Sequence, residues 1–208
     1  RGAVHIHTDP HEYGRRRSTI DSAVHWRAVC QTHVARMSAA ADTTATADSV
    51  TAISVRVIPP QMVWPLRHEV MWPSKPLEYV VIPGDEDAAT SRHFGLFLLD
   101  KDEPVSVVSL FWERREGQGV DESVAQFRKF CTRVSHQRKG YGTLLLERLV
   151  ADARAGGAKS LWCNARVEQA GYYRKLGLYE VPGRAFEKDG QRYVIMEMPL
   201  RRPTAREK

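Results

Sequence analysis

The sequence predicts a mixed α/β domain of about 160 residues, which runs from about residue 50 to about residue 200. Several short runs of β-branched and apolar residues alternate with period two, as half-buried strands do. One longer segment instead places leucines four residues apart, and glycine- or proline-containing turns separate these units. The resulting order is strand, helix, several strands, helix, strand, helix and a final strand pair, with no internal repeat.

The first half of the domain is expected to hold strands around one short helical segment. Ile53, Val55 and Val57 alternate in the first run, which makes it a strand. The segment 59–73 is helical or irregular, because Pro65 interrupts it and Pro73 ends it. A short polar turn joins the next two strands. The strands expected in this half cover residues 50–59, 93–100, 105–115 and 122–132.

The second half is expected to begin with the longest helix, from about Gly140 to about Ala155. Its core-facing stripe consists of Leu145, Leu146, Leu149, Val150 and Ala153, and Gly156 and Gly157 end it. A strand at 160–166 and a short helix at 168–177, closed by Gly177, come next. Residues 184–200 read as a hairpin that turns at Asp189 and Gly190.

Composition divides the chain into a disordered N-terminal tail or leader (1–48), one domain (49–202) and a short C-terminal tail (203–208). The first 48 residues hold five of the eight histidines and no lysine, and they end in a low-complexity Ala/Thr/Asp/Ser segment. Met37 is a candidate true start. An Arg-rich leader for organelle import is an alternative that the acidic residues oppose. A metal site in the histidine-rich segment 5–12 is disfavoured, because nothing there holds ligands rigid.

Bulk properties narrow the function classes. The net charge of +6 and the pI of about 9.4 indicate an acidic partner, which could be nucleic acid, a membrane surface or a phosphorylated small molecule. Three widely spaced cysteines form neither a disulfide framework nor a metal motif, so we expect a reducing, cytoplasmic location. We expect no membrane span, because no apolar run reaches about 18 residues, and we expect no membrane partner.

Two glycines and two cations occupy the turn that leads into the long helix. Gly140 and Gly142 lack a Cβ, so a ligand can approach their backbone closely, and Arg138 and Lys139 add positive charge. The first turn of a helix also carries unpaired N–H groups. Such a turn suits a phosphate or pyrophosphate. Neither GxGxxG nor GxxxxGK[ST] is present, which excludes two common nucleotide motifs.

The segment "QRKGYG" (137–142) resembles the Q/R-x-x-G-x-G/A motif of the GNAT superfamily of acetyl-CoA-dependent N-acetyltransferases. It stands between a strand and an amphipathic helix, as in that family. A second block in the expected order is also similar to the family, and the resemblance covers about residues 50–200. The matching residues of that block are Ala170, Tyr172, Tyr173, Lys175, Gly177 and Leu178.

The resemblance implies the acyl-CoA N-acyltransferase fold: a central, mostly antiparallel, splayed sheet flanked by helices. It implies acetyl-CoA as co-substrate and no metal. The strand end at Phe130, Cys131 and Thr132 would bind the pantetheine arm. Asn164 would take a further coenzyme contact, unless it caps a local turn. The pyrophosphate would bind at Gln137, Arg138, Lys139, Gly140, Tyr141, Gly142 and Thr143.

The resemblance also implies that Tyr173 is the acid that protonates the departing thiolate, with Tyr172 in a packing role. Many relatives carry Asn where this chain has Val167, and many carry a Glu on the fourth strand, which here has no acid. Glu113 is a conceivable base or a solvated strand end, so the base stays unassigned. Cys131 and Cys163 are expected to be small buried hydrophobes, not nucleophiles.

The sequence therefore predicts an N-acetyltransferase that moves acetyl from acetyl-CoA to a primary amine by direct attack in a ternary complex. The acceptor is a small-molecule or peptide amine, and the protein is a monomer or homodimer. A non-catalytic acetyl-CoA sensor of the same fold is the alternative. Nucleic acid is not expected, because no recognition helix or aromatic RNA motif accompanies the basic cluster. The acidic loop 83–89 either attracts a cationic amine or is simply solvated.

Overall fold

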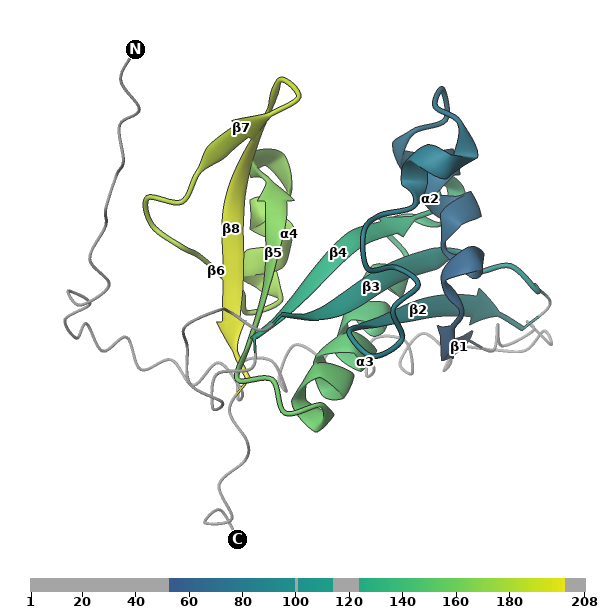
Figure 1. Cartoon of the computed structure of the whole chain (residues 1–208), viewed down its shortest axis with the longest axis horizontal. Coiled ribbons are helices and arrows are strands. Elements are labelled where there is room, and N and C mark those ends of the chain that lie inside the picture. Colours follow the sequence, from purple (N-terminus) through teal and green to yellow (C-terminus); the bar gives the residue numbers. More distant parts are fainter. Residues whose placement is uncertain (1–52, 100, 114–123, 201–208) are drawn as a thin grey trace, which may run out of the picture.

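The computed structural model describes residues 53–99, 101–113 and 124–200 (Figure 1). The tails expected at 1–48 and 203–208, with the histidine-rich segment, lie outside these ranges. The strands are β1 (Ile53–Ile58), β2 (Ser91–Leu98), β3 (Ser106–Glu113), β4 (Val124–Thr132), β5 (Ser160–Arg166), β6 (Tyr179–Glu180), β7 (Phe186–Lys188) and β8 (Gln191–Pro199).

Three α-helices and four short 3₁₀ turns accompany the strands in the described ranges. The helices are α2 (Trp64–Met71), α3 (Tyr141–Ala155) and α4 (Ala170–Lys175). The 3₁₀ turns are η1 (Pro60–Met62), η2 (Leu77–Val80), η3 (Val134–His136) and η4 (Val167–Gln169). None of the described helices has the length and apolar character that a bilayer crossing requires.

The strands form one sheet in the order β1-β2-β3-β4-β5-β8-β6, with β7 paired to β8. Every pairing is antiparallel except β4–β5, which is parallel and very short. That pairing ends at Gln126 opposite Trp162, and beyond it the two strands diverge (Figure 1). The predicted mixed α/β class with a mostly antiparallel, splayed sheet is confirmed.

A β-bulge interrupts β4 just past the last β4–β5 pair. Ser109 of β3 lies opposite Arg128, whereas Val107 lies opposite Cys131, so β4 contains one extra residue in this interval. Lys129 adopts the left-handed φ of 53° within it. The bulge changes which residues of β4 share a face.

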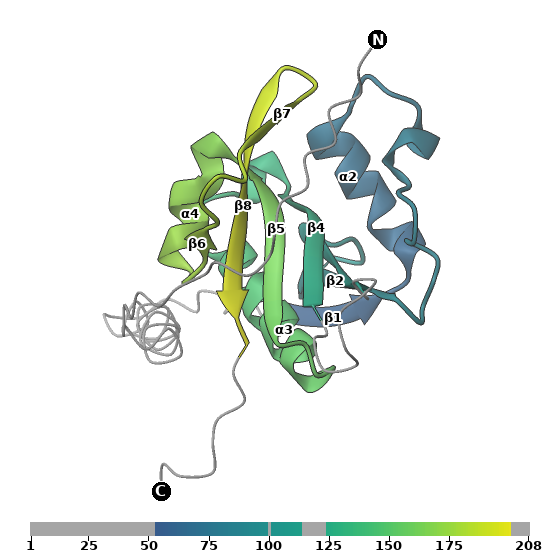
Figure 2. The same cartoon turned by 60° about the vertical axis from the view of Figure 1, so that its left-hand side comes forward.

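Helices cover both faces of the sheet (Figure 2). On one face, β2, β3 and β4 pack against the buried stripe of α3, and Ala170 of α4 joins the same core. On the other face, Leu66 and Val63 of the α2 region pack with Phe97, Val107 and Cys131. The predicted α3 stripe is confirmed, because all five of its apolar residues are buried.

The structure corrects two local expectations and confirms a third. Pro65 does not break the segment 59–73, because it lies in the first turn of α2, where its missing N–H has no helical partner to lose. The short strand β6 was not predicted, because two residues are too few to show the alternating pattern of a strand. The hairpin turn is confirmed, with left-handed φ values of 52° at Asp189 and 69° at Gly190.

Candidate active site

The divergence of β4 from β5 leaves one edge of β4 without a partner strand within the described ranges. The residues on this edge are Phe127 to Thr132, and β5 pairs with β4 only up to Gln126. Phe130 stacks on Tyr172 of α4, with ring centroids 6.3 Å apart and planes 21° apart. Cys131 is buried on the α2 face instead. The open edge offers backbone groups to an extended ligand in the manner of another strand.

The loop between β4 and α3 leaves several of its backbone amides without an acceptor among the described residues. The Nε2 of Gln137 donates to the carbonyl oxygen of Thr132 at 3.0 Å, which closes the loop onto the strand end. Arg138 and Gly140 both have left-handed φ, 61° and 82°. Among the described residues, no hydrogen-bond acceptor lies on the amides of 138–142. Left-handed residues next to ordinary ones turn successive N–H groups toward one side, which makes a cradle for an anion.

Positive charge surrounds this cradle. The side chains of Arg138 and Lys139 are exposed and close no ion pair with a described residue. Arg133 is different, because it pairs with Glu69 and Glu103, both at 3.2 Å, and so ties the loop to its neighbours. The pKa of His136 is lowered by partial burial and by the nearby cations Lys139 and Arg133. A neutral His136 adds no charge to the cradle at neutral pH.

The structure shows why position 142 is a glycine, which the sequence did not reveal. A Cβ at this position would lie 2.7 Å from Cζ of Phe130 and 3.3 Å from the hydroxyl oxygen of Tyr172. The glycine therefore lets the Phe130 ring pack against the start of α3. Gly140 is needed for its backbone conformation, since it caps the helix with a positive φ.

The two adjacent tyrosines of α4 occupy different environments. Tyr173 packs against Phe127 of β4, with ring centroids 5.7 Å apart. The pKa of its hydroxyl is raised by burial and by the neighbouring thiol of Cys163 on β5. Tyr173 therefore lies where β4 and β5 separate. Tyr172 stacks on Phe130 and hydrogen-bonds with Thr143.

The thiols are buried and unreactive. Burial raises the pKa of Cys131 to about 12 and raises the pKa of Cys163 as well. The Cys131 Sγ lies 3.8 Å from the carbonyl oxygen of Leu66. Neither thiol is a nucleophile at neutral pH, because the thiolate is the reactive form.

Asn164 lies on the exposed side of β5, beyond the last β4–β5 pair. Its side chain makes no hydrogen bond to another described residue, so the alternative that it caps a local turn is not supported. The side-chain amide of Asn164 therefore lies on the same side of the sheet as Trp162 and is available to a ligand.

A buried polar network under α2 was not predicted. Arg67 is fully buried and pairs with Asp85, with Nη2 donating to Oδ1 at 3.0 Å. Arg67 also donates to the hydroxyl of Ser109 at 2.6 Å, and Ser109 contacts Nδ1 of His93. Asp85 belongs to the acidic loop 83–89 and is only 2% exposed, so it does not attract a cationic amine from solvent. An isolated Arg in a short helix gives no sequence signal of this pairing.

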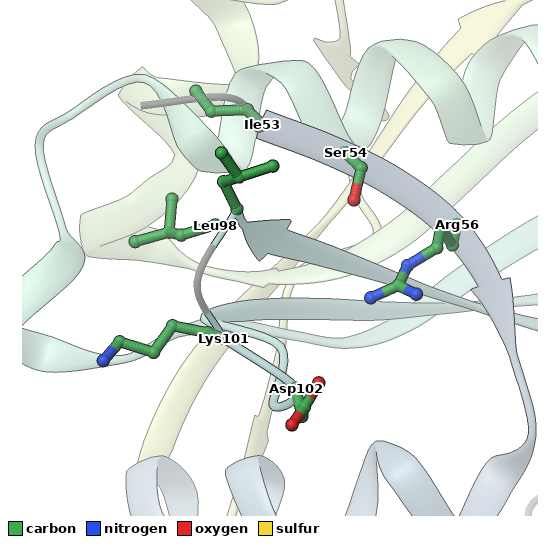
Figure 3. Close-up of a pocket in the computed structure, with 7 residues that line it drawn as sticks. Ile53, Ser54, Arg56, Leu98, Lys101 and Asp102 are labelled. Carbon is green, nitrogen blue, oxygen red and sulfur yellow. The ribbon is translucent and has the colours of Figure 1, made fainter. Parts of the chain in front are cut away.

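A hollow of about 260 Å³ lies elsewhere, across β1 and the β2–β3 turn (Figure 3). Its lining residues are Ile53, Ser54, Arg56, Leu98, Leu99, Lys101 and Asp102, and none is a predicted site residue. Two strands separate β1 from β4 in the sheet. Within the described ranges, no three His, Cys, Asp or Glu side chains are grouped to hold a metal ion.

Residues 61–178 match the model of the acetyltransferase (GNAT) family, which is more than half of the chain. The chain belongs to the GNAT acetyltransferase family. Its matched region contains the β4 bulge, the cradle and both tyrosines. Membership makes the chain an acyltransferase, and the N-acetyltransferase relatives below agree with that.

Relatives support the same GNAT assignment. The uncharacterized N-acetyltransferase YitI of Bacillus subtilis is 25% identical over 150 residues, which is 72% of this chain and 97% of YitI. A crystal structure assigned to the N-acetyltransferases of Lactobacillus plantarum has a TM-score of 0.58 at 21% identity, covering 72% of this chain and 99% of that one. Arabidopsis thaliana NAA60, solved with acetyl-CoA, has a TM-score of 0.56 at 10% identity over 72% of this chain and 99% of its own. The two structures show the shared fold.

The described part of this GNAT chain offers no carboxylate on β4. The side chain of Glu113, the conceivable base, lies outside the described part of the structure. Just beyond the point where β4 separates from β5, β4 instead carries Arg128 and Lys129, and both side chains are half-buried. The base therefore stays unassigned, and these two cations need a separate explanation.

Proposed function

We propose that this protein transfers the acetyl group of acetyl-CoA to a primary amine by direct attack in a ternary complex. One observation carries the proposal. The open edge of β4 leads directly into a cradle of acceptor-free amides at the start of α3. A ligand with an extended amide-containing arm and a pyrophosphate matches this pair of features in that order.

The coenzyme would be bound by the residues that the sequence indicated. Phe130, Cys131 and Thr132 would contribute backbone groups to the pantetheine arm, and Asn164 would contact it from β5. The pyrophosphate would accept hydrogen bonds from the amides of the cradle, and the positive charges of Arg138 and Lys139 would attract it. The predicted pyrophosphate residues are Gln137, Arg138, Lys139, Gly140, Tyr141, Gly142 and Thr143. The acceptor-free amides among them are those of 138–142, because the amides of Gln137 and Thr143 donate to Val134 and Gly140.

The reaction requires one bond to form and one to break. The neutral amine nitrogen attacks the thioester carbonyl carbon, and a backbone N–H at the β4 bulge would stabilise the oxyanion. The C–S bond then breaks, and the CoA thiolate takes a proton from the hydroxyl of Tyr173. Burial raises the pKa of Tyr173, so the hydroxyl is protonated at neutral pH and passes its proton on only as negative charge develops on the adjacent sulfur. The amine would release its own proton to water.

The test is calorimetric titration of acetyl-CoA into the full chain and into an Arg138→Gln/Lys139→Gln variant. Both side chains are exposed, so their removal disturbs no packing. We expect the dissociation constant to rise about tenfold, which is about 1.4 kcal/mol. A charge-matched control, Arg92→Gln/Lys159→Gln, removes two cations near the other end of α3, one of which pairs with Asp152, and should bind as the parent does. The Gly142→Glu change is unsuitable, because it collides with Phe130.

Turnover is then measured as free thiol released in the presence of primary amines. Absence of acetyl-CoA binding by the folded parent would overturn the proposal. Binding without thiol release from any amine would favour the alternative, a non-catalytic acetyl-CoA sensor. Sedimentation of the same sample decides between the monomer and the homodimer.

A further inference from the structure

The β4 bulge places two consecutive cations on one face of the sheet. In a regular strand, Arg128 and Lys129 would point to opposite faces, and the extra residue removes that alternation. The guanidinium of Arg128 lies 5.3 Å from the ring centre of Phe111, and Nζ of Lys129 lies 4.3 Å from that of Trp72. Trp72 directly follows α2, and Arg128 lies opposite Ser109, which binds Arg67 of α2, so both cations lie on the α2 side.

These cations are half-buried and close no ion pair with another described residue. The nearby carboxylate of Asp85 is already bound by Arg67. The pKa of Lys129 is lowered to about 8 by burial, by Arg128 and Arg67, and by Lys188 of β7, while Asp85 raises it. Half-buried positive charge without a carboxylate partner is costly, and an anion placed there would relieve it.

The location links this positive charge to the proposed chemistry. Arg128 and Lys129 follow the last β4–β5 pair by two and three residues, so they adjoin the point where the strands separate. Tyr173 reaches the same point from the α4 face, through Phe127. The coenzyme is proposed to lie along Phe130 to Thr132, immediately after Lys129. The α2 face is thus the side from which an acceptor would approach.

We propose that the acceptor is an amine that carries a carboxylate close to the reacting nitrogen, and that Arg128 and Lys129 bind this carboxylate. The inference rests on the proposed acetyl transfer. A guanidinium and an ammonium from consecutive residues on one face of the sheet suit a carboxylate, which accepts hydrogen bonds from both. Trp72 and Tyr79, whose rings are 5.5 Å apart, add an aromatic wall beside Lys129 that favours an apolar side chain on the acceptor.

The test compares matched acceptors with the full chain at saturating acetyl-CoA, with thiol release as the readout. The first pair is phenylalanine and phenethylamine, which differ only in the carboxylate. The second pair consists of two peptides that begin with Asp or Asn, which separates a peptide source of the carboxylate from a free amino acid. We expect kcat/KM to be at least tenfold higher for the carboxylate member of one pair.

Variants test whether Arg128 and Lys129 cause the preference for the carboxylate-bearing acceptor. Arg128→Gln and Lys129→Gln should each lower kcat/KM about tenfold for the carboxylate member and change its partner less than about threefold. The control Arg92→Gln removes a strand arginine that also lies over an aromatic ring, Trp112, at 5.1 Å. It should leave both members unchanged. Two independent variants keep the test decisive if one of them fails to fold.

The pH dependence provides a second readout. Lys129 is protonated below a pKa of about 8, so its attraction for a carboxylate is lost as the pH rises through that value. Arginine stays charged, and Lys129→Arg should therefore keep the preference at pH 9, where the parent loses part of it. Comparing parent and variant on one acceptor at one pH cancels the titration of the amine itself.

The outcomes separate the two proposals. Equal or lower kcat/KM for both carboxylate members, or a preference that survives in both Gln variants, would overturn the inference and leave the transferase intact. No thiol release from any acceptor, with acetyl-CoA still bound, would remove the catalytic role and the inference together. Failure to bind acetyl-CoA would contradict the proposed function itself.

Discussion

Tyr172 and Tyr173 are neighbours in sequence, yet they have different surroundings, which supports the different roles proposed for them. Tyr172 holds Phe130 against the start of α3 and is hydrogen-bonded with Thr143. Tyr173 lies against Phe127 and near Cys163, between the strands that separate. A hydroxyl in that gap can reach a sulfur there, whereas the hydroxyl of Tyr172 already has a partner. This geometry supports Tyr173 as the acid.

We expect Tyr173→Phe to lower kcat about a hundredfold, the low end of what a positioned general acid contributes. Phenylalanine keeps the ring that packs on Phe127, so the melting temperature should change little. The dissociation constant for acetyl-CoA should stay within about twofold, because the hydroxyl acts on the departing sulfur. Thiol release at saturating substrates measures kcat, and calorimetry measures binding.

The control for this change is Tyr172→Phe, which removes the neighbouring hydroxyl from the same helix. It should cost activity less than about fivefold, since its ring stacking on Phe130 is kept. If Tyr172→Phe lowered kcat as much as Tyr173→Phe, the roles given to the two tyrosines would be wrong.

At the scale of elements, α3 and β4 meet through a close contact between Gly142 and Phe130. In an isolated helix, Gly→Ala is stabilising by about 0.5–1 kcal/mol. Here the new Cβ would lie 2.7 Å from Cζ of Phe130, so we expect Gly142→Ala to destabilise the fold by about 1–3 kcal/mol. Urea unfolding monitored by tryptophan fluorescence measures the free energy of unfolding.

A double variant tests the cause. Phe130→Leu shortens the side chain that collides, so the destabilisation by Gly142→Ala should be smaller in its presence than in the parent. Strictly additive free energies would show that Phe130 is not what limits this position. The outcome also bears on the family motif, because it separates the packing role of the second glycine from any contact with phosphate.

At the scale of the whole molecule, one buried network joins α2, the loop 83–89, β2 and β3. Nε2 of His93 donates to the carbonyl oxygen of Asp85 at 2.7 Å, so Nδ1 accepts from the hydroxyl of Ser109. Ser109 in turn accepts from Arg67. These roles hold for a neutral His93, and its lowered pKa favours that form at neutral pH. Protonation of His93 would break this chain of donors and acceptors.

The network makes the fold acid-labile. Burial lowers the pKa of His93 below 6.5, so the unfolded chain binds the proton more readily and the free energy of unfolding falls as the pH drops below about 6.5. For Asp85, burial acts to raise the pKa, but the hydrogen bond and charge of Arg67 outweigh it and lower the pKa. Its contribution is present above 3.8 and is lost as the pH falls through the lowered pKa.

Urea unfolding at pH 7.5, 6.5, 5.5 and 4.5 should therefore show a steady loss of stability toward acid. His93→Gln should flatten the dependence between pH 6.5 and 5.5, although it lowers stability at every pH. His136, whose pKa is also lowered, is the comparison: it is much less buried, and His136→Gln should keep most of the slope. An unchanged slope in His93→Gln would contradict the role given to the network.

The sequence by itself determined the order of elements, the α3 stripe, the hairpin turn and the turn that precedes α3, because each depends on residues close together in the chain. Period-two and period-3.6 patterns, glycine positions and the family motif are all local. The same information placed Tyr173, Gly140 and the Arg138–Lys139 pair next to the elements that hold them.

Only the tertiary structure decided how distant residues meet. The bulge at Lys129 depends on the register between β4 and β3, and the Arg67–Asp85 pair joins residues from different elements. The contact of Phe130 with Gly142 likewise needs the packing angle of α3 on the sheet. Register, burial and packing angle depend on how the whole core packs, and no local sequence pattern determines that packing. For this reason the sequence predicted where a coenzyme would bind but gave no sign that Arg128 and Lys129 share one face of the sheet.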